Sequence, residues 1–307
     1  MHSLLRPQWH HLVVFVLPAM LLYSVFMSLP LLDSLRLSLY QTQSDSSLVF
    51  VGLKQFSILF TDSDYSPRFW GALHNNVLFF SIFMLIQNPI GLLLAELLSS
   101  GQLRGSAIYR TVIFAPTTLS VVIVGWIWTL MLNPIWGVIN DVFKAIGIGG
   151  LIPKEGWLGS TSMALVVVSL VGVWQYVGLP FILFLAALIG LDEELIDAAR
   201  VDGASPWMIF WQIKFPLILP TVGIVTILTF VGNFSAFENV FVMQGSQAGP
   251  DYATDLLGTF FYRTMFGGYG RLPNLNLGTT IAASMFIIIL IGVCSYLLIF
   301  QRRLVRD

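Results

Sequence analysis

The sequence has 307 residues, of which 56% are hydrophobic and 10% are charged, and its formal net charge is −1. Soluble domains usually carry about 25% charged residues, and a soluble fold of this size has too little interior for so much apolar surface. The composition therefore predicts an all-α polytopic membrane protein with lipid around much of its surface. The near-zero charge offers no basic surface to nucleic acid.

Cysteine and histidine usage limits the chemistry that the chain can perform. The one cysteine, Cys294, lies in an apolar run, which excludes an internal disulfide and a cysteine-based metal cluster. None of the four histidines (His2, His10, His11 and His74) forms a zinc-binding pair with a nearby acid. We therefore expect no metal site, and we interpret Cys294 as a packing residue.

Six apolar segments are long enough to cross a bilayer, which takes about 20 mainly apolar residues. The first exceeds the apolar core of a secretory signal, roughly 7–15 residues, and no cleavage pattern follows it, so we expect an uncleaved span. Together they predict one transmembrane domain, residues 11–300, between an N-terminal segment (1–10) and a C-terminal tail (301–307). The expected spans are 12–32, 76–97, 109–132, 163–190, 217–243 and 279–300.

Positive charge is distributed unequally between the two sides of these spans. Six spans place both termini on one side, which holds eight cations in about 57 residues, against seven in about 109 on the other side. Because cytoplasmic segments are the cation-rich ones, we expect both termini in the cytoplasm. The cations assigned to the cytoplasm are Arg6, Arg104, Arg110, Arg200, Lys214, Arg302, Arg303 and Arg306. Those assigned to the other side are Arg36, Lys54, Arg68, Lys144, Lys154, Arg263 and Arg271.

The segment between the fourth and fifth spans, residues 191–216, reads as two short helices with a turn between them. Asp192 is placed to cap the first helix and Gly203 to end it, since glycine adopts left-handed backbone angles without strain. Ser205 is placed to cap the second helix, which begins with a proline. We expect Pro216 to end this helix before the fifth span. The spacing of the apolar residues, taken by itself, is typical of a helical hairpin with no role beyond linking two spans.

The residues of this hairpin closely resemble the EAA loop of ABC importer permeases. That pattern reads Glu-Ala-Ala-x-x-Asp-Gly-Ala, then Phe-x-x-Ile-x-x-Pro and a second proline, before the penultimate core span. The chain follows it from residue 197 to residue 220, with aspartate in place of the first glutamate. The resemblance implies the all-α fold of an ABC type I importer permease. The matching residues are Asp197, Ala198, Ala199, Asp202, Gly203, Ala204, Phe210, Ile213, Pro216 and Pro220.

In that family the loop is a coupling helix that sits in a groove of a separate ATP-binding subunit. Small residues permit close approach, and acidic ones accept hydrogen bonds. No Gly-x-x-x-x-Gly-Lys-[Ser/Thr] phosphate loop occurs in the sequence. We therefore expect no enzymatic activity and no cofactor in this chain, with ATP and Mg bound by a partner ATPase. The resemblance implies the coupling role for Asp197, Ala198, Ala199, Asp202, Gly203 and Ala204.

Looser similarities point to the carbohydrate-uptake branch. Residues 50–76 look like the entry to the core in those permeases, and residues 234–243 with Gly249-Pro250 look like its Phe-x-x-Phe-Asp-x-Ile-Tyr-Val and Gly-Gly-Pro segments. Glu238 departs from the aspartate of that pattern. The set is similar to the first permease of the maltose-transporter type. It implies a second permease, two ATP-binding subunits or domains, an extracytoplasmic solute-binding protein and a sugar substrate, in a bacterial cytoplasmic membrane.

Polar residues within the spans are candidates for a substrate path, because an unpartnered polar group in lipid costs several kcal/mol. Aromatic rings beside amides and carboxylates suit a sugar. Ser235, Glu238 and Asn239 are expected on one helical face, at i, i+3 and i+4. The alternative is that these residues hold helices together. The candidates are Trp174, Gln175, Ser235, Glu238 and Asn239.

The absence of Lys and Arg from residues 215–262 favours an uncharged sugar or polyol over glycerol phosphate. An importer of another solute, such as glycerol phosphate or a polyamine, remains open within the same class. An ion-coupled secondary carrier is a further alternative, although Glu238 is the one charge deep in a span. A membrane scaffold without transport is a third.

Overall fold

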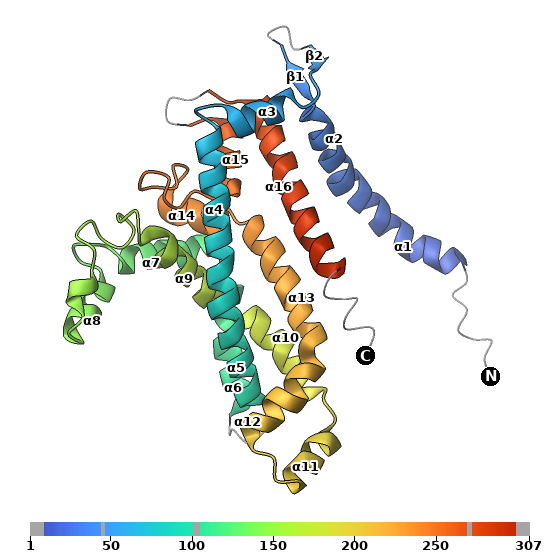
Figure 1. The fold of residues 1–307 in the computed structure, drawn as a ribbon, viewed down its shortest axis with the longest axis vertical. Coiled ribbons are helices and arrows are strands. Elements are labelled where there is room, and N and C mark those ends of the chain that lie inside the picture. The colour runs from blue at the N-terminus through green and yellow to red at the C-terminus, as the bar shows by residue number, and fades with distance from the viewer. Residues whose placement is uncertain (1–8, 44–46, 101–104, 269–271, 299–307) are drawn as a thin grey trace.

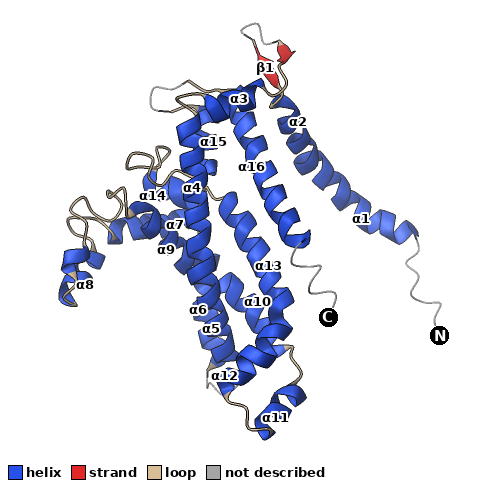
Figure 2. Ribbon diagram, viewed as in Figure 1, coloured by secondary structure: helices blue, strands red, loops and turns tan. Residues whose placement is uncertain are grey.

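The computed structural model describes residues 9–43, 47–100, 105–268 and 272–298, which are mostly helical (Figures 1 and 2). A small antiparallel sheet pairs Tyr40 with Phe50 and Thr42 with Leu48. The expectations for Arg6, Arg104, Arg271 and the charged tail of Arg302, Arg303 and Arg306 lie outside the described residues. In chain order the elements are α1 (Trp9–Tyr23), η1 (Ser24–Ser28), α2 (Leu29–Leu37), β1 (Tyr40–Thr42), β2 (Leu48–Phe50), α3 (Lys54–Thr61), α4 (Ser66–Ile82), η2 (Phe83–Gln87), α5 (Asn88–Ser99), α6 (Ser106–Phe114), η3 (Ala115–Thr118), α7 (Val121–Met131), α8 (Val138–Ala145), η4 (Gly149–Leu151), α9 (Ala164–Tyr176), α10 (Gly178–Ile189), α11 (Glu193–Val201), α12 (Pro206–Ile209), η5 (Phe210–Lys214), α13 (Phe215–Phe234), α14 (Glu238–Gln244), α15 (Leu257–Phe266) and α16 (Leu275–Tyr296).

Four continuous helices are long and apolar enough to cross a membrane: Val13–Leu37, Ser66–Ser99, Pro206–Phe234 and Leu275–Tyr296. Two further pairs of helices pass the same test together but are bent between their halves. Residues 106–131 bend by 94° and residues 164–189 by 43°. Within the described residues the count is therefore four, or six if each bent pair crosses once, which agrees with the six segments found in the sequence.

Three of the expected spans are interrupted, and the fourth is the bent pair of α9 and α10, which meet at Val177. The third breaks at Leu119 and Ser120, where the backbone is extended after a 3₁₀ turn that contains Pro116. The fifth was expected to run to residue 243, which is wrong, since α13 ends at Phe234. The last turn of the helix is satisfied from outside, because Asn76 of the second span donates to the carbonyl of Asn233 (2.9 Å).

Within the described residues, three spans contain a complete π-helical turn, and in each the second residue after that turn is a proline: Pro30, Pro89 and Pro216. A proline in an α-helix lacks the N–H donor and clashes with the carbonyl four residues before it. The wider π turn moves that carbonyl away, so the helix continues. The expectation that Pro216 ends a helix is therefore wrong, because the helix runs unbroken from Pro206 to Phe234.

The interior consists of separate apolar clusters rather than one continuous core. The cluster near the α11–α12 hairpin is called the hairpin-side core, and a second one, which packs α4 and η2 against α7, α9 and α14, is called the far-side core (Figure 1). A third cluster packs α3 and α4 against α15 and α16. The hairpin-side core contains Ala95, Leu98, Phe181, Phe184, Leu185, Leu188, Ile218 and Val225. The far-side core contains Phe79, Phe83, Val124, Leu132, Trp157, Leu165, Val168, Val171, Val173, Val240, Met243, Ala248 and Leu256.

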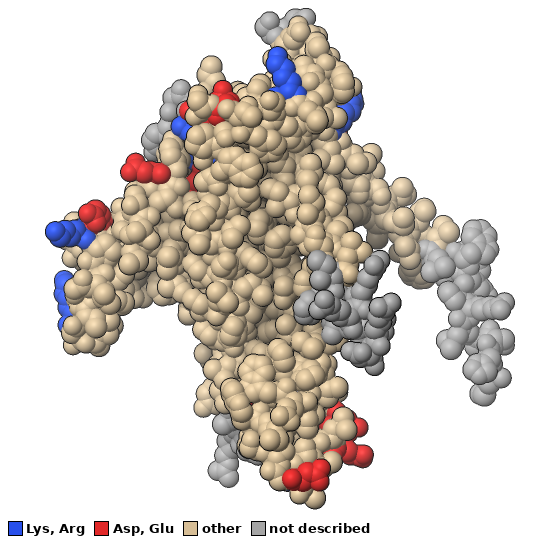
Figure 3. All heavy atoms as spheres, in the orientation of Figure 1, with Lys and Arg blue, Asp and Glu red and all other residues tan. Residues whose placement is uncertain are grey.

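The surface matches a protein surrounded by lipid. In the view of Figure 3, charged side chains gather at the top, on the arm at the left and at the bottom, and the central part of the molecule shows none. In the first long helix α1 stands away from the bundle, whereas α2 lies beside α16 (Figure 1), and no residue from Val13 to Leu37 is buried. Such a broad apolar exterior confirms a multi-pass membrane protein.

Candidate functional site

Local hydrogen bonds set the shape of the α11–α12 hairpin. The Asp192 carboxylate accepts from the backbone N–H of Glu194 (3.0 Å), and the Ser205 hydroxyl oxygen accepts from that of Met208 (3.3 Å). Gly203 has a φ of +79°, in the left-handed region that glycine adopts without strain. Both predicted caps and the predicted helix stop are confirmed.

The hairpin projects from one end of the molecule (Figure 1) and exposes most of the candidate coupling residues. Ala199 and Ala204 are half-buried, whereas Asp197, Ala198, Asp202 and Gly203 are exposed. Large apolar side chains are exposed beside them, with Val201 at 88% and Trp207 at 72%. A mixture of small, acidic and apolar side chains on a projecting tip offers a contact surface to another molecule. The exposed group consists of Leu195, Asp197, Ala198, Val201, Asp202, Gly203 and Trp207.

The base of the hairpin is attached to two spans. The ammonium group of Lys214 lies 2.6 Å from the carboxylate of Glu96 at the end of α5, and both side chains are largely buried. Ile209 is buried, and Trp211 packs on Phe215 with ring centroids 5.0 Å apart. A displacement of the hairpin would therefore be transmitted to the second and fifth spans.

A cavity of about 580 Å³ lies between the second, fourth and fifth spans. Its wall is mainly apolar, with polar groups from several elements. Among the predicted path residues, Ser235, Glu238 and Asn239 line it. They do not share one helical face as expected, because the chain leaves α13 at Ser235 and starts α14 at Glu238. The lining residues are Phe79, Phe83, Gln87, Tyr176, Leu179, Pro180, Leu183, Val225, Leu228, Thr229, Gly232, Asn233, Ser235, Ala236, Phe237, Glu238 and Asn239.

Trp174 and Gln175 do not line the cavity. Gln175 is 1% exposed and donates from Nε2 to the carbonyl of Leu119 (3.2 Å) at the break of the third span. Trp174 packs edge-on against Trp128, with ring centroids 5.6 Å apart. Both side chains hold α9 against α7 and the turn that precedes it. This agrees with the alternative interpretation of these polar residues, in which they hold helices together. The next residue, Tyr176, reaches the cavity instead.

Buried amides connect the second span to the fifth. Asn88 donates from Nδ2 to the hydroxyl oxygen of Thr229 (3.2 Å). Asn76 donates to the carbonyl of Asn233 (2.9 Å) and accepts from the N–H of Leu257 (2.8 Å). These bonds satisfy polar groups that lipid cannot, and they fix the wall of the cavity where α13 ends.

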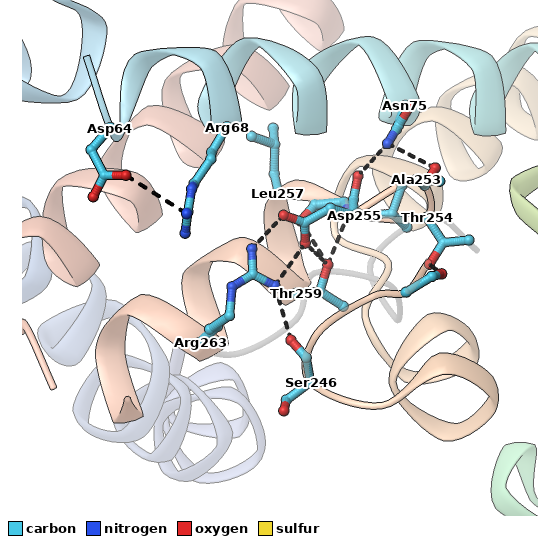
Figure 4. A network of polar contacts seen from close by, with 12 residues as sticks. Asp64, Arg68, Asn75, Ser246, Ala253, Thr254, Asp255, Leu257, Thr259 and Arg263 are labelled. Carbon is cyan, nitrogen blue, oxygen red and sulfur yellow. Dashed lines mark hydrogen bonds and ion pairs between the residues drawn. The ribbon is translucent and has the colours of Figure 1, made fainter. Parts of the chain in front are cut away.

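A buried ion pair holds the connector between the fifth and sixth spans (Figure 4). The guanidinium of Arg263 pairs with the carboxylate of Asp255, both 3% exposed as side chains, and also donates to the carbonyl of Ser246 (2.9 Å). Thr259 donates to the same carboxylate (2.7 Å). Burial by itself raises the pKa of the Asp255 carboxyl, and the charge and hydrogen bonds of Arg263 act in the opposite direction.

This ion pair is joined to α4 by Asn75, which donates to the carbonyls of Ala253 (3.2 Å) and Asp255 (2.9 Å). The ring of Tyr252 lies between two guanidinium groups. The distance from the ring centroid to Cζ is 4.7 Å for Arg263 and 4.9 Å for Arg68. The connector, which includes α15, is thus fixed to α4 by contacts between residues far apart in the sequence.

Residues 87–307 match the family model described as "Binding-protein-dependent transport system inner membrane component". The chain belongs to this family. The match includes the hairpin, the cavity residues from Gln87 onward and the buried ion pair, so the family assignment from the hairpin motif is confirmed.

Two relatives of this permease match nearly its whole length. A lactose transport system permease protein of Rhizobium radiobacter is 33% identical over 290 residues, covering 94% of this chain and 93% of the relative. An osmoprotective compounds uptake permease protein of Synechocystis sp. is 30% identical and covers 90% of this chain and 94% of the relative.

The fold of the permease is that of a solved ABC importer. A chain of the bacterial alginate ABC transporter, solved with its pentasaccharide-bound periplasmic protein, superposes with a TM-score of 0.78 and is 22% identical. The superposition covers 96% of this permease and 95% of that chain. The expected importer-permease fold is confirmed.

Two functional features of the permease were not found from the sequence. Gln87 and Thr229 line the cavity, but neither is among the predicted path residues. The one signal that the sequence offers for them is the amide of Gln87 within an apolar span. Asp255 and Arg263 lie in a connector whose sequence shows two ordinary charges eight residues apart. Nothing in that spacing indicates a buried pair.

Proposed function

We propose that this permease is the membrane subunit of an ATP-driven importer for a sugar or another neutral, hydroxyl-rich solute. The observation that carries the substrate class is the composition of the cavity wall, in which, among the residues that the structure describes, Glu238 is the one charged side chain and no Lys or Arg takes part. A phosphate or carboxylate favours a cation or the N-terminus of a helix beside it. The N-terminus of α14 reaches the wall, but its first residue is Glu238, whose carboxylate would repel an anion. The relative named for lactose supports the same class.

The solute passes through the cavity in this proposal. The rings of Phe79, Phe83 and Tyr176 supply flat faces for the C–H surfaces of a sugar, and Ser235, Glu238 and Asn239 supply polar contacts for its hydroxyls. A volume of about 580 Å³ is in the usual range for a small-molecule site.

The energy comes from another polypeptide. ATP and Mg are bound by a partner ATPase that docks on Asp197, Ala198, Ala199, Asp202, Gly203 and Ala204, and a second permease completes the pathway. The hairpin and both termini lie in the cytoplasm of a bacterium, and an extracytoplasmic binding protein delivers the solute on the far side. Closure of the ATPases moves the hairpin, and its base at Lys214 and Glu96 transmits this motion to the spans.

Replacing residues 194–205 with a Gly/Ser linker of equal length tests the proposal in the full complex. We expect the ATPase to stop co-purifying and ATP-driven uptake of neutral sugars to be lost, while the permease keeps its elution volume and melting temperature. The single substitution Arg200→Ala is the control, since it removes only an exposed pair within α11. Uptake that persists after the replacement, and that an uncoupler abolishes, would contradict the proposal and favour an ion-coupled carrier.

A further inference from the structure

Gly232 lies in the fifth span at a position where the backbone conformation does not call for a glycine. It belongs to α13 and its φ is not positive, so the left-handed freedom of glycine is not used there. Glycine is the weakest helix former after proline, and within a helix it is destabilising relative to alanine. A glycine at this position therefore needs another explanation.

The surroundings of Gly232 differ from those of Gly223 in the same helix. A Cβ added at Gly223 would lie 2.5 Å from the phenol oxygen of Tyr296, so this glycine lets the end of α16 approach α13. Gly232 is exposed, and apart from its chain neighbours and the backbone of its own helix, no atom of the described residues lies within 4 Å of its Cβ position. Close packing within this chain therefore does not explain Gly232.

The open space beside Gly232 belongs to the cavity. Five residues of α13 line the cavity, and at about 100° per residue they cover an arc of about 140° around the helix axis. Gly232 lies near the middle of this arc. Because helical side chains project outward from the axis, a side chain at position 232 would enter the cavity. The five residues are Val225, Leu228, Thr229, Gly232 and Asn233.

The second and fourth spans contribute large side chains to the cavity wall, among them Phe79, Phe83 and Tyr176. A glycine on the fifth span provides room that these residues do not, and it lets a ligand approach the backbone closely. We propose that Gly232 is a specificity-determining residue: part of the sugar occupies the space left by the missing side chain, and this space limits the size of the solute that can pass. This inference rests on the proposed function and adds to it a size limit and the residue that sets it.

Stability and transport should respond differently to substitution of Gly232. Gly232→Ala, Gly232→Val and Gly232→Leu add side chains of increasing size to the cavity, and each variant is prepared in the full complex with its ATPase and second permease. Gly232→Ala should leave the melting temperature unchanged or raise it, since alanine favours the helix and the added methyl group meets open space. The matched control is Gly71 in α4, which is also exposed and has open space at its Cβ position, but lies outside the cavity.

Uptake into proteoliposomes is measured with saturating binding protein, for radiolabelled glucose, lactose, raffinose and glycerol 3-phosphate. For the largest neutral sugar that the wild type takes up, the rate should fall from Gly232→Ala through Gly232→Val to Gly232→Leu. The last variant should lower the rate about 10-fold or more, because a pocket discriminates by such factors against a single added methylene group. The same substitutions at Gly71 should keep the rate within about twofold of the wild type, as is usual for exposed positions.

Thiol labelling locates Gly232 independently of the uptake rates. Gly232→Cys and Gly71→Cys are each combined with Cys294→Ser, which removes the one native thiol of this chain. The complexes are treated with a charged methanethiosulfonate during ATP turnover. Gly232→Cys should react, and the transported sugar should slow its reaction severalfold while leaving that of Gly71→Cys unchanged.

Three results would show that the role of Gly232 is wrong while the proposed function stands. The first is that Gly232→Leu takes up the wild-type sugar as fast as the wild type does. The second is that Gly232→Cys does not react. The third is that Gly232→Ala already separates the two permeases, because the glycine would then pack against the second permease. If the wild type takes up glycerol 3-phosphate instead, or none of the neutral sugars, the proposed function is wrong and the inference is wrong with it.

Discussion

The permease has two long connectors around its fifth span, and they are built in opposite ways. The α11–α12 hairpin before that span is fixed by capping bonds between close neighbours, and large apolar side chains are exposed on it. The connector after it, residues 235–274, is fixed by a buried ion pair and by amides that reach across from α4.

This difference separates two tasks. A segment with local structure and an exposed mixed surface is suited to fit the groove of another molecule. A segment that is anchored at several points is suited to keep the nearby cavity residues in place, since Glu238 and Asn239 lie between Asn233, which Asn76 holds, and Ser246, which Arg263 holds. The comparison predicts large stability effects for substitutions in the second connector and small ones in the first.

Arg263→Met should have the largest effect, because it leaves the carboxylate of Asp255 buried without its cation. Breaking one side of a buried pair costs about 3–5 kcal/mol. Urea unfolding of the detergent-solubilised complex, followed by intrinsic fluorescence, measures the loss. The double variant Arg263→Met with Asp255→Leu should be clearly more stable than the single variant. A single variant within 1 kcal/mol of wild type, roughly, would show that the pair does not anchor the connector.

Asn76→Leu should rank second. The substitution leaves the carbonyl of Asn233 and the N–H of Leu257 without their bonds, in a place that is fully buried. Two such groups together cost about 2–4 kcal/mol. Thermal unfolding and sugar binding should both be affected, because Asn233 lines the cavity. Asn75→Leu, at the neighbouring half-buried position, is the control and should disturb binding less.

Lys214→Met should have an intermediate effect, since the pair with Glu96 is partly screened by its exposed edge. We expect a loss of about 1–2 kcal/mol in unfolding free energy. ATPase activity should be retained while uptake per ATP hydrolysed falls, because the pair joins the base of the hairpin to the second span. If the amount of solute taken up per ATP hydrolysed is unchanged, the motion of the hairpin reaches the spans through other contacts.

Gly203→Ala should change stability least. No atom lies within 4 Å of the position that the added Cβ would occupy, so the cost is the strain of a positive φ, about 1 kcal/mol. The substitution nevertheless changes the shape of the exposed turn. Co-purification of the partner ATPase should fall severalfold while the melting temperature stays nearly constant. Arg200→Ala, which breaks only an exposed pair, should leave both unchanged.

The same contrast explains which features could be predicted from the sequence. Apolar segments of sufficient length revealed the spans, and the capping residues Asp192, Gly203 and Ser205 revealed the hairpin, because each depends on neighbours within a few positions. The end of α13 could not be predicted in this way, since its last turn is bonded to Asn76, 157 positions away.

The helix at Pro216 and the cavity wall show the same limit. Proline rules predict a break at Pro216, but one added residue in the preceding turn avoids the clash. Gln175 and Gln87 are both amides in apolar spans, and the sequence favoured Gln175 because aromatic residues surround it. Which of them faces the cavity depends on how the neighbouring helices pack, and that information is spread over the whole chain.

The division of the interior into separate apolar clusters has a consequence for energetics. Phe79 and Phe83 belong to the far-side core and Val225 to the hairpin-side core, and all three form the wall of the same cavity. A molecule held there touches both halves, so its affinity depends on the spacing between them. If the two clusters can stand at two different spacings, a solute that binds tenfold more tightly at one spacing shifts the free-energy difference between the two arrangements by about 1.4 kcal/mol. A solute that binds equally tightly at both spacings leaves that difference unchanged, whatever its affinity.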